Sequence, residues 1–362
     1  MSHLRSKLLR WFRKHARVLP WRKAPKSVDP LYPKDIPLRR NPYQVWIAEI
    51  MLQQTQVATV VPYYQKWMKR FPHLGTLALA PEAEVLKFWA GLGYYNRARN
   101  LQKAAQNILA SGRYPVSAED WISLPGIGPY TAGAICSLAF NFPEPILDGN
   151  VTRVLSRIHG LAFLPGDGAK QKATYWNLAR QWAGGKNPGD VNEALMELGA
   201  LICTPASPQC LQCPLASDCY ANKRGQQNSL PPAKQRPSVE TVAGVAAIGI
   251  QRGKVLMMVR PQGAFLAGHN LFPLFLNKGG KNWKNEFAKV FSAQKISGIP
   301  EKRGAVKHAI MNRRYVLQVF FFQVNASTRG LAKSDSQVKW IPETEIENAL
   351  TNSLARKIWN LR

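Results

Sequence analysis

The sequence predicts two domains, an all-helical domain followed by a smaller one that combines helices with strands. Its 362 residues suffice for two hydrophobic cores at roughly 150 residues per domain. Apolar residues recur at helical spacing through residues 1–225, whereas β-rich runs fill the later part of the chain. Between them, residues 222–238 are polar and rich in proline, as is typical of a linker. We therefore assign residues 1–221 to the first domain and residues 239–362 to the second.

The helices expected in the first domain combine apolar residues at helical spacing with capping signals. Asn41-Pro42 is one such signal, because it places a cap residue before a proline at the first helical position. Residues 23–40 lack periodicity and are rich in proline, lysine and arginine, so we expect a loop that contacts phosphate groups. The expected helices cover residues 43–61, 81–90, 97–111, 129–140, 149–159, 170–183 and 190–202.

In the second domain, runs of β-forming residues are separated by glycine and asparagine turns. The expected strands cover residues 242–250, 254–260 and 315–324, and residues 283–292 and 343–361 show helical patterns. This mixture predicts an α+β domain.

The charge of the chain points to a polyanionic partner. Lysine and arginine number 49 against 21 acidic residues, a net charge of +28. Twelve basic residues fall within residues 1–40 and eight within residues 251–300, against two and one acidic residues. A solvated surface that only aids solubility is the alternative, but so large a charge favours nucleic acid. Apolar runs of membrane-spanning length and a signal peptide are both missing, so we expect a cytosolic protein and no membrane partner.

Four of the five cysteines form one cluster with the spacing C-x6-C-x2-C-x5-C, namely Cys203, Cys210, Cys213 and Cys219. A cytosolic chain of this size does not favour disulfides, so the thiolates are candidate metal ligands. Structural zinc usually takes two tight cysteine pairs, and only the middle pair is tight here. The spacing therefore favours a [4Fe–4S] cluster, with zinc as the alternative. Cys136 lies alone in an apolar helix and is expected in the core.

A glycine turn, Gly126-Ile127-Gly128, precedes the helix expected at residues 129–140. Its backbone N–H groups and the N-terminus of that helix can bind a phosphate group without side-chain charge. A simple turn is the alternative, but the pattern is typical of a helix-hairpin-helix element over about residues 113–140.

Two carboxyl groups are candidate catalytic residues. Glu49 is the only charge between Arg40 and Lys66, in an apolar stretch where burial would raise its pKa and make it a general acid. A structural carboxyl paired with an arginine such as Arg22 is the alternative. Asp148 opens the helix expected at 149–159, where a plain N-cap role is the alternative. Because helix-start amides favour the charged form, we expect Asp148 to stay ionised.

Together these motifs resemble the MutY-type adenine DNA glycosylases, within the helix-hairpin-helix glycosylase superfamily. The matching segments span nearly the whole first domain in the family's order: LPWR (19–22), WIAEIMLQQTQV (46–57), GLGYYNRARNL (91–101), LPGIGPYTAGAI (124–135), LDGNVTRVLSR (147–157), NEALMELGALIC (192–203) and the four cysteines. The resemblance implies a monomeric enzyme with one [4Fe–4S] cluster, acting on duplex DNA that carries an adenine mispair. It also implies a cytoplasmic location at the bacterial nucleoid.

The resemblance also assigns roles to residues. It implies that Glu49 protonates an extruded adenine and that Asp148 stabilises the sugar cation, the two-carboxylate scheme of glycoside hydrolysis. Tyr130 and Asn150 match positions that assist this chemistry in the family. The residues that match the lining of the adenine pocket are Trp21, Arg22, Leu52 and Glu193. The residues that match those wedging into the base stack are Gln54, Thr55, Leu92 and Tyr94. The structural alternatives are core packing for Leu92, Tyr94 and Tyr130, and a surface carboxylate for Glu193.

Position 130 predicts the subclass. Related endonuclease III-type enzymes hold a lysine there, whose amine forms a Schiff base and drives strand cleavage. A phenol cannot form an imine, so Tyr130 predicts a monofunctional enzyme that leaves an abasic site.

Residues 239–362 resemble the family's Nudix-like domain, which reads 8-oxoguanine opposite the adenine. Only three acidic residues lie between 241 and 342, too few for the metal site of a Nudix hydrolase. The family's Phe-Ser-His tip is replaced by Ile310-Met311-Asn312, so we expect Met311 and Asn312 to contact the lesion with altered discrimination. Excision of thymine or an oxidised pyrimidine, and DNA binding without catalysis, are the competing functions.

Overall fold

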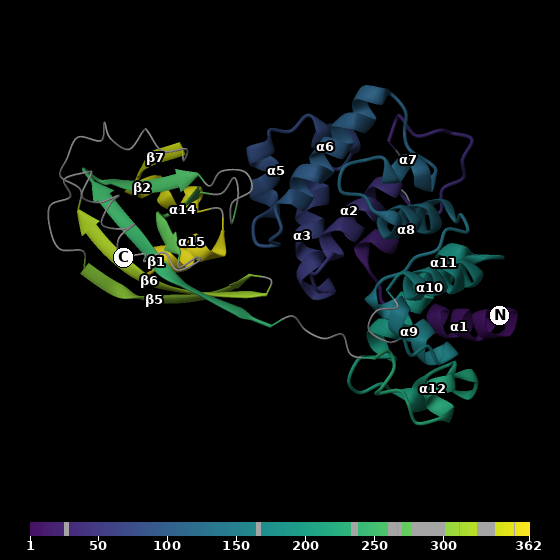
Figure 1. The fold of residues 1–362 in the computed structure, drawn as a ribbon. Coiled ribbons are helices and arrows are strands. Elements are labelled where there is room, and N and C mark those ends of the chain that lie inside the picture. Colours follow the sequence, from purple (N-terminus) through teal and green to yellow (C-terminus); the bar gives the residue numbers. More distant parts are fainter. Residues whose placement is uncertain are drawn as a thin grey trace. The chain divides into compact units, whose positions relative to one another are not determined.

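The computed structural model divides the chain into two compact units, Met1–Lys234 and Gln235–Arg362. Figure 1 shows a helical first unit and a second unit built on a sheet. The described residues are 1–24, 29–163, 168–232, 238–259, 266, 270–276, 301–310, 312–323, 337–350 and 352–362. Within these ranges, no helix has both the length and the apolar character needed to cross a bilayer.

The first unit is all-helical, as the sequence predicts. Its α-helices are α1 (Ser2–His15), α2 (Pro42–Leu52), α3 (Val57–Arg70), α4 (Leu74–Ala78), α5 (Glu82–Trp89), α6 (Asn96–Ser111), α7 (Ala118–Ile122), α8 (Pro129–Phe140), α9 (Gly149–His159), α10 (Gly168–Ala183), α11 (Pro188–Leu201) and α12 (Tyr220–Lys223). Single 3-10 turns are η1 (Pro20–Arg22), η2 (Cys210–Gln212) and η3 (Ala216–Asp218). Helix α8 packs against α2 and α11, and α11 also packs against α1 and α9.

The helix expected at residues 43–61 is in fact two helices, α2 and α3. The break falls at Gln54, whose φ of 58° lies in the left-handed region that a helix cannot contain. Asn41 caps the start of α2 as predicted, because its side chain accepts from the backbone N–H groups of Tyr43 and Gln44.

The end of the first unit lies beyond the expected domain boundary. Residues 222–232 belong to this unit rather than to a free linker. Helix α12 packs against α9, and buried Arg157 donates from Nε to the carbonyl of Leu230 at 2.8 Å.

The second unit is a mixed sheet with short helices on it. Its strands are β1 (Glu240–Gln251), β2 (Lys254–Val259), β3 (Asn270–Leu271), β4 (Leu274–Leu276), β5 (Glu301–Ile310), β6 (Arg313–Gln323) and β7 (Gln337–Pro342). The order is β3-β2-β1-β6-β5, with β4 paired to β1 and β7 to β2; β1 and β6 run parallel, and the other pairs are antiparallel. The three expected strands correspond to β1, β2 and β6.

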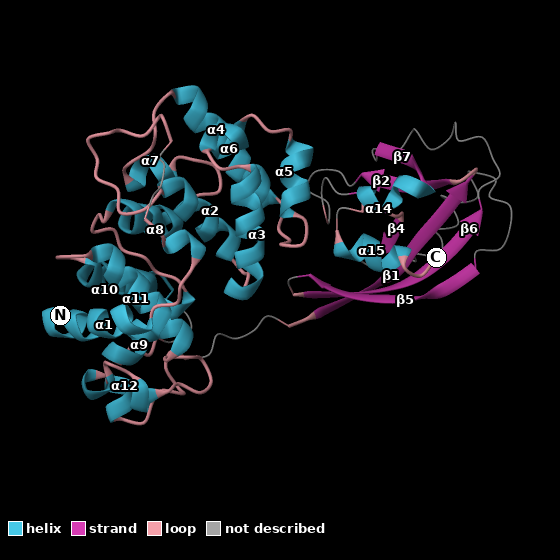
Figure 2. Ribbon diagram, turned by 180° about the vertical axis from the view of Figure 1, so that it is seen from behind, coloured by secondary structure: helices cyan, strands magenta, loops and turns pink. Residues whose placement is uncertain are grey.

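The sequence predicts two helices in the second unit, and the structure describes only one of the two segments. The helix expected at residues 343–361 is broken into η5 (Glu343–Glu345), α14 (Ile346–Ala349) and α15 (Ser353–Trp359). Helices α14 and α15 share a core with β1, β2 and β6 and cover one face of the sheet (Figure 2). The helix expected at residues 283–292 lies outside the described residues.

Candidate active site

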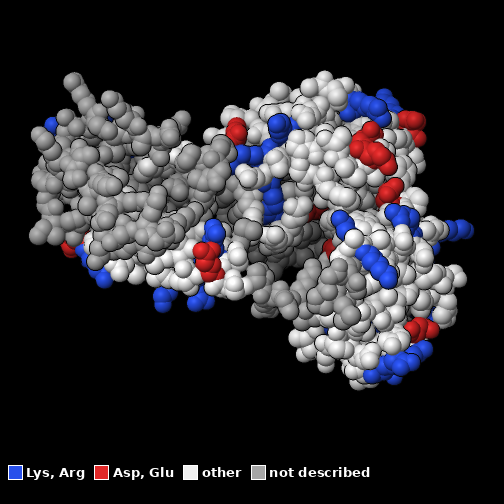
Figure 3. All heavy atoms as spheres, viewed as in Figure 1, with Lys and Arg blue, Asp and Glu red and all other residues white. Residues whose placement is uncertain are grey.

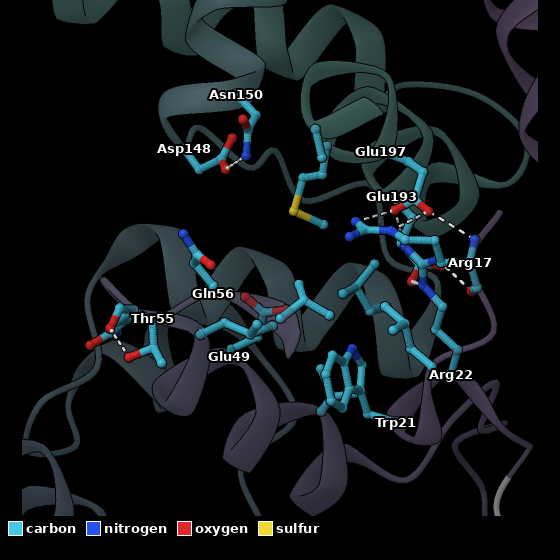
Figure 4. Close-up of a pocket in the computed structure, with 18 of the residues that line it drawn as sticks. Arg17, Trp21, Arg22, Glu49, Thr55, Gln56, Asp148, Asn150, Glu193 and Glu197 are labelled. Atoms are coloured by element: carbon cyan, nitrogen blue, oxygen red, sulfur yellow. Dashed lines mark hydrogen bonds and ion pairs between the residues drawn. The ribbon is translucent and has the colours of Figure 1, made fainter. Parts of the chain in front are cut away.

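A cavity of about 880 Å³ in the first unit is lined by ten of the twelve side chains that the sequence predicts for catalysis and substrate binding. Figure 4 shows Glu49, from α2, and Asp148, at the start of α9, on different walls of it. The predicted residues that line it are Trp21, Arg22, Glu49, Leu52, Gln54, Thr55, Tyr130, Asp148, Asn150 and Glu193. Sequence reasoning missed the lining residues Arg17, Arg40, Gln53, Gln56, Met196 and Glu197. Glu197 was within reach of that reasoning, because it follows Glu193 by four residues and so shares its helix face.

Glu49 is a buried carboxyl whose hydrogen-bond partner is a phenol. Helix α2 is apolar on all sides and therefore buried, which leaves the Glu49 residue 5% exposed. Tyr130, in the first turn of α8, donates from its hydroxyl to Oε2 of Glu49 at 2.8 Å. Burial raises the pKa of Glu49 to about 7, against the opposing effect of the Tyr130 hydrogen bond. The alternative of a carboxyl paired with Arg22 is wrong, because that guanidinium binds Glu193 and Glu197 instead.

Asp148 caps a helix and also lines the cavity, so its place in the structure is compatible with both roles that the sequence left open. It is the N-cap of α9, and its Oδ1 accepts from the backbone N–H of Val151 at 2.7 Å. We expected such amides to keep the carboxylate ionised. They do lower its pKa, but burial outweighs them and the pKa of Asp148 is raised above its ordinary value.

Asn150 holds Asp148 from the side. Its Nδ2 donates to Oδ2 of Asp148 at 2.9 Å, and its own Oδ1 accepts from Arg153 at 2.9 Å. Arg153 also donates to the carbonyls of Gly199 and Cys203, both at 2.7 Å. Glycine at position 199 permits this approach, because a Cβ there would lie 2.6 Å from the Asn150 Cβ. Asp148 is thereby fixed between the start of α9 and the end of α11.

The opposite wall carries a cluster of ion pairs, which we call the arginine–glutamate cluster: Arg17, Arg22, Arg40, Glu193 and Glu197. Arg22 bridges the two glutamates at 2.9 Å each, Arg17 pairs with Glu197, and Arg40 forks onto Glu193. Hydrogen bonds and charges from these arginines outweigh burial, so the pKa of Glu193 is lowered and that of Glu197 falls to about 2. Glu193 is therefore a buried anion in the pocket wall, and the alternative of a surface carboxylate is wrong.

Two residues of the basic 23–40 loop face inward rather than toward phosphate. Arg40 is buried against Glu193, and Arg39 pairs with Asp190. The backbone N–H groups of both arginines donate to the carbonyl of Ala139 at the end of α8. For Arg39 and Arg40 the expected phosphate contact is therefore replaced by a structural one.

The four expected wedge residues lie on two turns. Gln54 and Thr55 lie on the turn at residues 53–56, between α2 and α3, and Gln54 is exposed. Leu92 and Tyr94 lie on the turn at residues 90–95, between α5 and α6. Leu92 is only 6% exposed, so the core-packing alternative holds for it in the DNA-free protein, whereas the Tyr94 ring is 54% exposed. Gln54 lines the cavity and Tyr94 does not.

The glycine turn lies between α7 and α8, as the helix-hairpin-helix pattern predicts. Gly126 has a φ of 78°, and a Cβ there would meet Asn100 at 2.8 Å, so glycine is required. Ile127 is buried and anchors the turn. Gly128 is the N-cap of α8, which leaves the first N–H groups of that helix for a phosphate group.

The four clustered cysteines are half-buried and close enough to influence one another. Burial, together with the neighbouring Cys203, Cys210 and Cys219, raises the pKa of Cys213 to about 12. Arg157 donates to Sγ of Cys203 at 3.3 Å. Among the described residues, no group of three or more His, Cys, Asp or Glu is arranged to hold a single metal ion. The donor set suits a cationic group, since positive charge would relieve the mutual repulsion of four thiolates.

In the second unit, the expected lesion-contacting tip is the turn between β5 and β6. Ile310 pairs with Arg313 across it, and the carbonyl of Asn312 accepts from the N–H of Glu240 at 2.9 Å. Met311 lies outside the described residues. The geometry places Asn312 at an exposed hairpin turn and leaves its contact with a lesion a prediction.

In its fold and pocket, the first unit resembles the base excision repair proteins of the helix-hairpin-helix class. The model of the family described as "HhH-GPD superfamily base excision DNA repair protein" matches residues 47–176. The structure of a thermostable thymine-DNA glycosylase is 26% identical with a TM-score of 0.51, covering 62% of this chain and 96% of its own.

Comparison with curated relatives shows which family within this class the chain belongs to. An adenine DNA glycosylase of Buchnera aphidicola subsp. Schizaphis graminum is 34% identical over 284 residues, which cover 77% of this chain and 72% of that protein. The chain belongs to the adenine DNA glycosylase family. The enzyme of that name from Mus musculus is 44% identical over 251 residues, covering 67% of this chain and 46% of its own. The human one is 44% identical over 233 residues, covering 64% and 41%. The chain thus spans about half the length of these two mammalian relatives.

Proposed function

We propose that this protein is a monofunctional adenine DNA glycosylase, which hydrolyses the N-glycosidic bond of an adenine paired with 8-oxoguanine or guanine. One observation carries the proposal: a buried carboxyl with a pKa of about 7, Glu49, shares a cavity with a second carboxylate, Asp148. A group with that pKa can both give and take a proton near neutral pH. The name of the family's curated members supports adenine as the base.

In the first step, protonated Glu49 gives its proton to N7 of an adenine that has been extruded into the cavity. The C1′–N9 bond breaks, its electron pair stays on the base, and adenine leaves as a neutral molecule. Asp148, held by Val151 and Asn150, stabilises the positive charge that develops on the sugar. The Tyr130 hydroxyl holds the Glu49 carboxyl in one orientation.

In the second step, a water molecule attacks C1′ and Glu49 accepts its proton, which restores the starting enzyme. The product is an abasic site with both strands intact. Tyr130 supports this outcome, because the position holds a phenol and no amine is available there to form a Schiff base.

The arginine–glutamate cluster supports recognition of the base. Glu193 stays ionised and already accepts from Arg22 and Arg40, so it attracts an exocyclic amine by its negative charge and cannot donate a hydrogen bond to a carbonyl oxygen. This polarity favours adenine over thymine in the pocket.

Duplex DNA is the proposed substrate and partner. The net charge of +28 and the glycine turn before α8 support phosphate binding. On the visible face of the first unit, basic side chains are interspersed with acidic ones (Figure 3). On this face, charge alone therefore does not mark a path for the DNA. We place the monomer in the bacterial cytoplasm, at the nucleoid.

A [4Fe–4S] cluster and a reader domain complete the proposal. Cys203, Cys210, Cys213 and Cys219 would hold the cluster, which supplies a structural cross-link when bound. Residues 239–362 act as a Nudix-like reader of the base opposite the adenine, with Asn312 at its tip.

A base-release assay on the full chain tests the proposal. Duplexes with adenine opposite 8-oxoguanine, guanine or cytosine, and with thymine opposite guanine, are incubated with the enzyme and then with alkali. We expect cleavage only after alkali, only at adenine, and fastest opposite 8-oxoguanine or guanine. Strand cleavage without alkali, or release of thymine instead of adenine, would contradict the proposal. Iron and sulfide analysis of the purified protein tests the cluster, with zinc as the contrary result.

A further inference from the structure

Arg97 joins the two turns that carry the wedge residues. It lies in the first turn of α6, directly after the turn at residues 90–95. Its side chain reaches across to the end of α2, where the turn at residues 53–56 begins. The function described so far gives this arginine no task.

One edge of the guanidinium caps α2. Nη1 donates to the carbonyls of Ile50 at 2.8 Å and Gln53 at 2.5 Å, with Met51 at 3.4 Å. These are carbonyls of the last turn of α2 and the residue beyond it, which lack intrahelical partners. A cation there also compensates the negative end of the helix dipole. The helix so capped carries Glu49 and Leu52.

The other edge of the guanidinium holds the second turn. Nη2 donates to the carbonyls of Leu92 at 3.1 Å and Gly93 at 3.4 Å. The plane lies near the rings of Trp89 and Tyr94, at 5.2 and 5.6 Å from their centroids. The turn needs this support, because Gly91, Gly93 and Tyr94 all have positive φ.

We propose that Arg97 is a positioning residue that locks the 53–56 and 90–95 turns together, so that Gln54 and Tyr94 enter the base stack as one preformed wedge. The inference rests on the proposed function. Extruding a base costs unstacking energy, which the wedge offsets only if it does not have to be ordered at the same time. Arg97 acts through the turns and leaves the chemistry of Glu49 untouched.

The fork geometry explains why arginine is needed. Five N–H donors in one plane can serve both turns at once, whereas a lysine is a single point donor. A lysine at this position would keep the positive charge and cap one turn only. The variant Arg97→Lys therefore separates the charge of this residue from its bridging role.

The test compares Arg97→Lys, Arg97→Gln and wild type in single-turnover adenine release from two duplexes. One duplex is fully paired around an A·8-oxoguanine mispair, and the other has mismatches on both sides of it, which loosen the stack. The control is Arg99→Lys, two residues further along α6, where the arginine pairs with exposed Glu82. Melting temperature reports folding for every variant. If Arg97→Gln does not fold, Arg97→Lys carries the test.

We expect Arg97→Lys to slow release from the paired duplex by about 10²-fold, the loss that a mutation far from the chemistry causes when it misplaces the substrate. On the loosened duplex its rate should return close to that of wild type, and its rate should fall with pH at the same point as wild type. Arg99→Lys should behave as wild type on both duplexes. Equal losses on both duplexes, no loss on either, or a shifted pH limit would overturn the inference. Absence of release by the wild type itself would instead refute the proposed function.

Discussion

The two walls of the cavity hold buried glutamates in opposite states. Glu49 contacts a hydroxyl, and burial raises its pKa to about 7. Glu197, equally buried, contacts two arginines and has a pKa of about 2. The comparison teaches that the partner, rather than burial, decides whether a buried carboxyl becomes a proton donor or a permanent anion. The same type of side chain therefore has a pKa near neutrality in one part of the cavity and stays ionised in another.

Exchanging each glutamate for glutamine should break this comparison most sharply. Glu49→Gln removes the proton donor, so we expect the single-turnover rate to fall by about 10²–10⁴-fold. Glu193→Gln removes a binding charge, so KM should rise while the single-turnover rate at saturation falls far less. Rates measured across a range of enzyme concentrations separate the two. Equal losses of saturating rate would mean that both walls take part in the chemistry.

Removing one arginine from the arginine–glutamate cluster should destabilise the protein. Arg40→Met leaves Glu193 with fewer cationic partners in a buried site, so we expect a loss of stability of about 3–5 kcal/mol. Thermal and urea unfolding measure it. The double variant Arg40→Met with Glu193→Gln should recover part of the loss, and a double variant no better than Arg40→Met would contradict the pairing.

The two walls should also give stability opposite pH dependences. The pKa of Glu49 is raised on folding, so its contribution to stability is complete below about pH 4.5 and is lost as pH rises through 7. The pKa of Glu197 is lowered on folding, so its contribution to stability is complete above about pH 4.5 and is lost as pH falls through 2. Each change amounts to about 3 kcal/mol. Unfolding free energies from pH 2 to 8 should lose the neutral slope in Glu49→Gln and the acid slope in Glu197→Gln. Unchanged slopes in either variant would contradict its assignment.

The smallest effect should come from Tyr130→Phe. The Tyr130 hydroxyl lowers the pKa of Glu49, so its removal should move that pKa further upward. The upper limit of the pH–rate profile should then shift to higher pH, with a modest change in rate at neutral pH. A shift to lower pH would show that the hydroxyl stabilises the protonated carboxyl instead.

The sequence predicted those features of the fold and the site that depend on residues adjacent in the chain. A lone charge in the apolar segment around Glu49 indicated a carboxyl that is either paired with an arginine or raised in pKa. The structure shows it buried against Tyr130 with a raised pKa. The cap at Asn41 was predicted from two adjacent residues. The all-helical first unit followed from helical spacing with capping signals, and the mixed second unit from β-rich runs separated by turn residues.

Features set by distant contacts were out of reach. Arg22 pairs with glutamates more than 170 positions away, so no local pattern could assign its partner. The break at Gln54 has a positive φ without a glycine to announce it. Strand β5 was missed because its burial pattern is largely exposed, as suits the edge of a sheet.

The hydrogen bond between Arg157 and Leu230 dictates where the first unit can be separated from the rest of the chain. A fragment cut after Ala221 would lose the carbonyl that this buried guanidinium binds, together with the second half of α12. A fragment that ends at Lys234 keeps both, next to the cysteines that Arg157 also contacts. Truncation at a composition change in the sequence would thus cut into the fold, whereas a cut thirteen residues later would spare it.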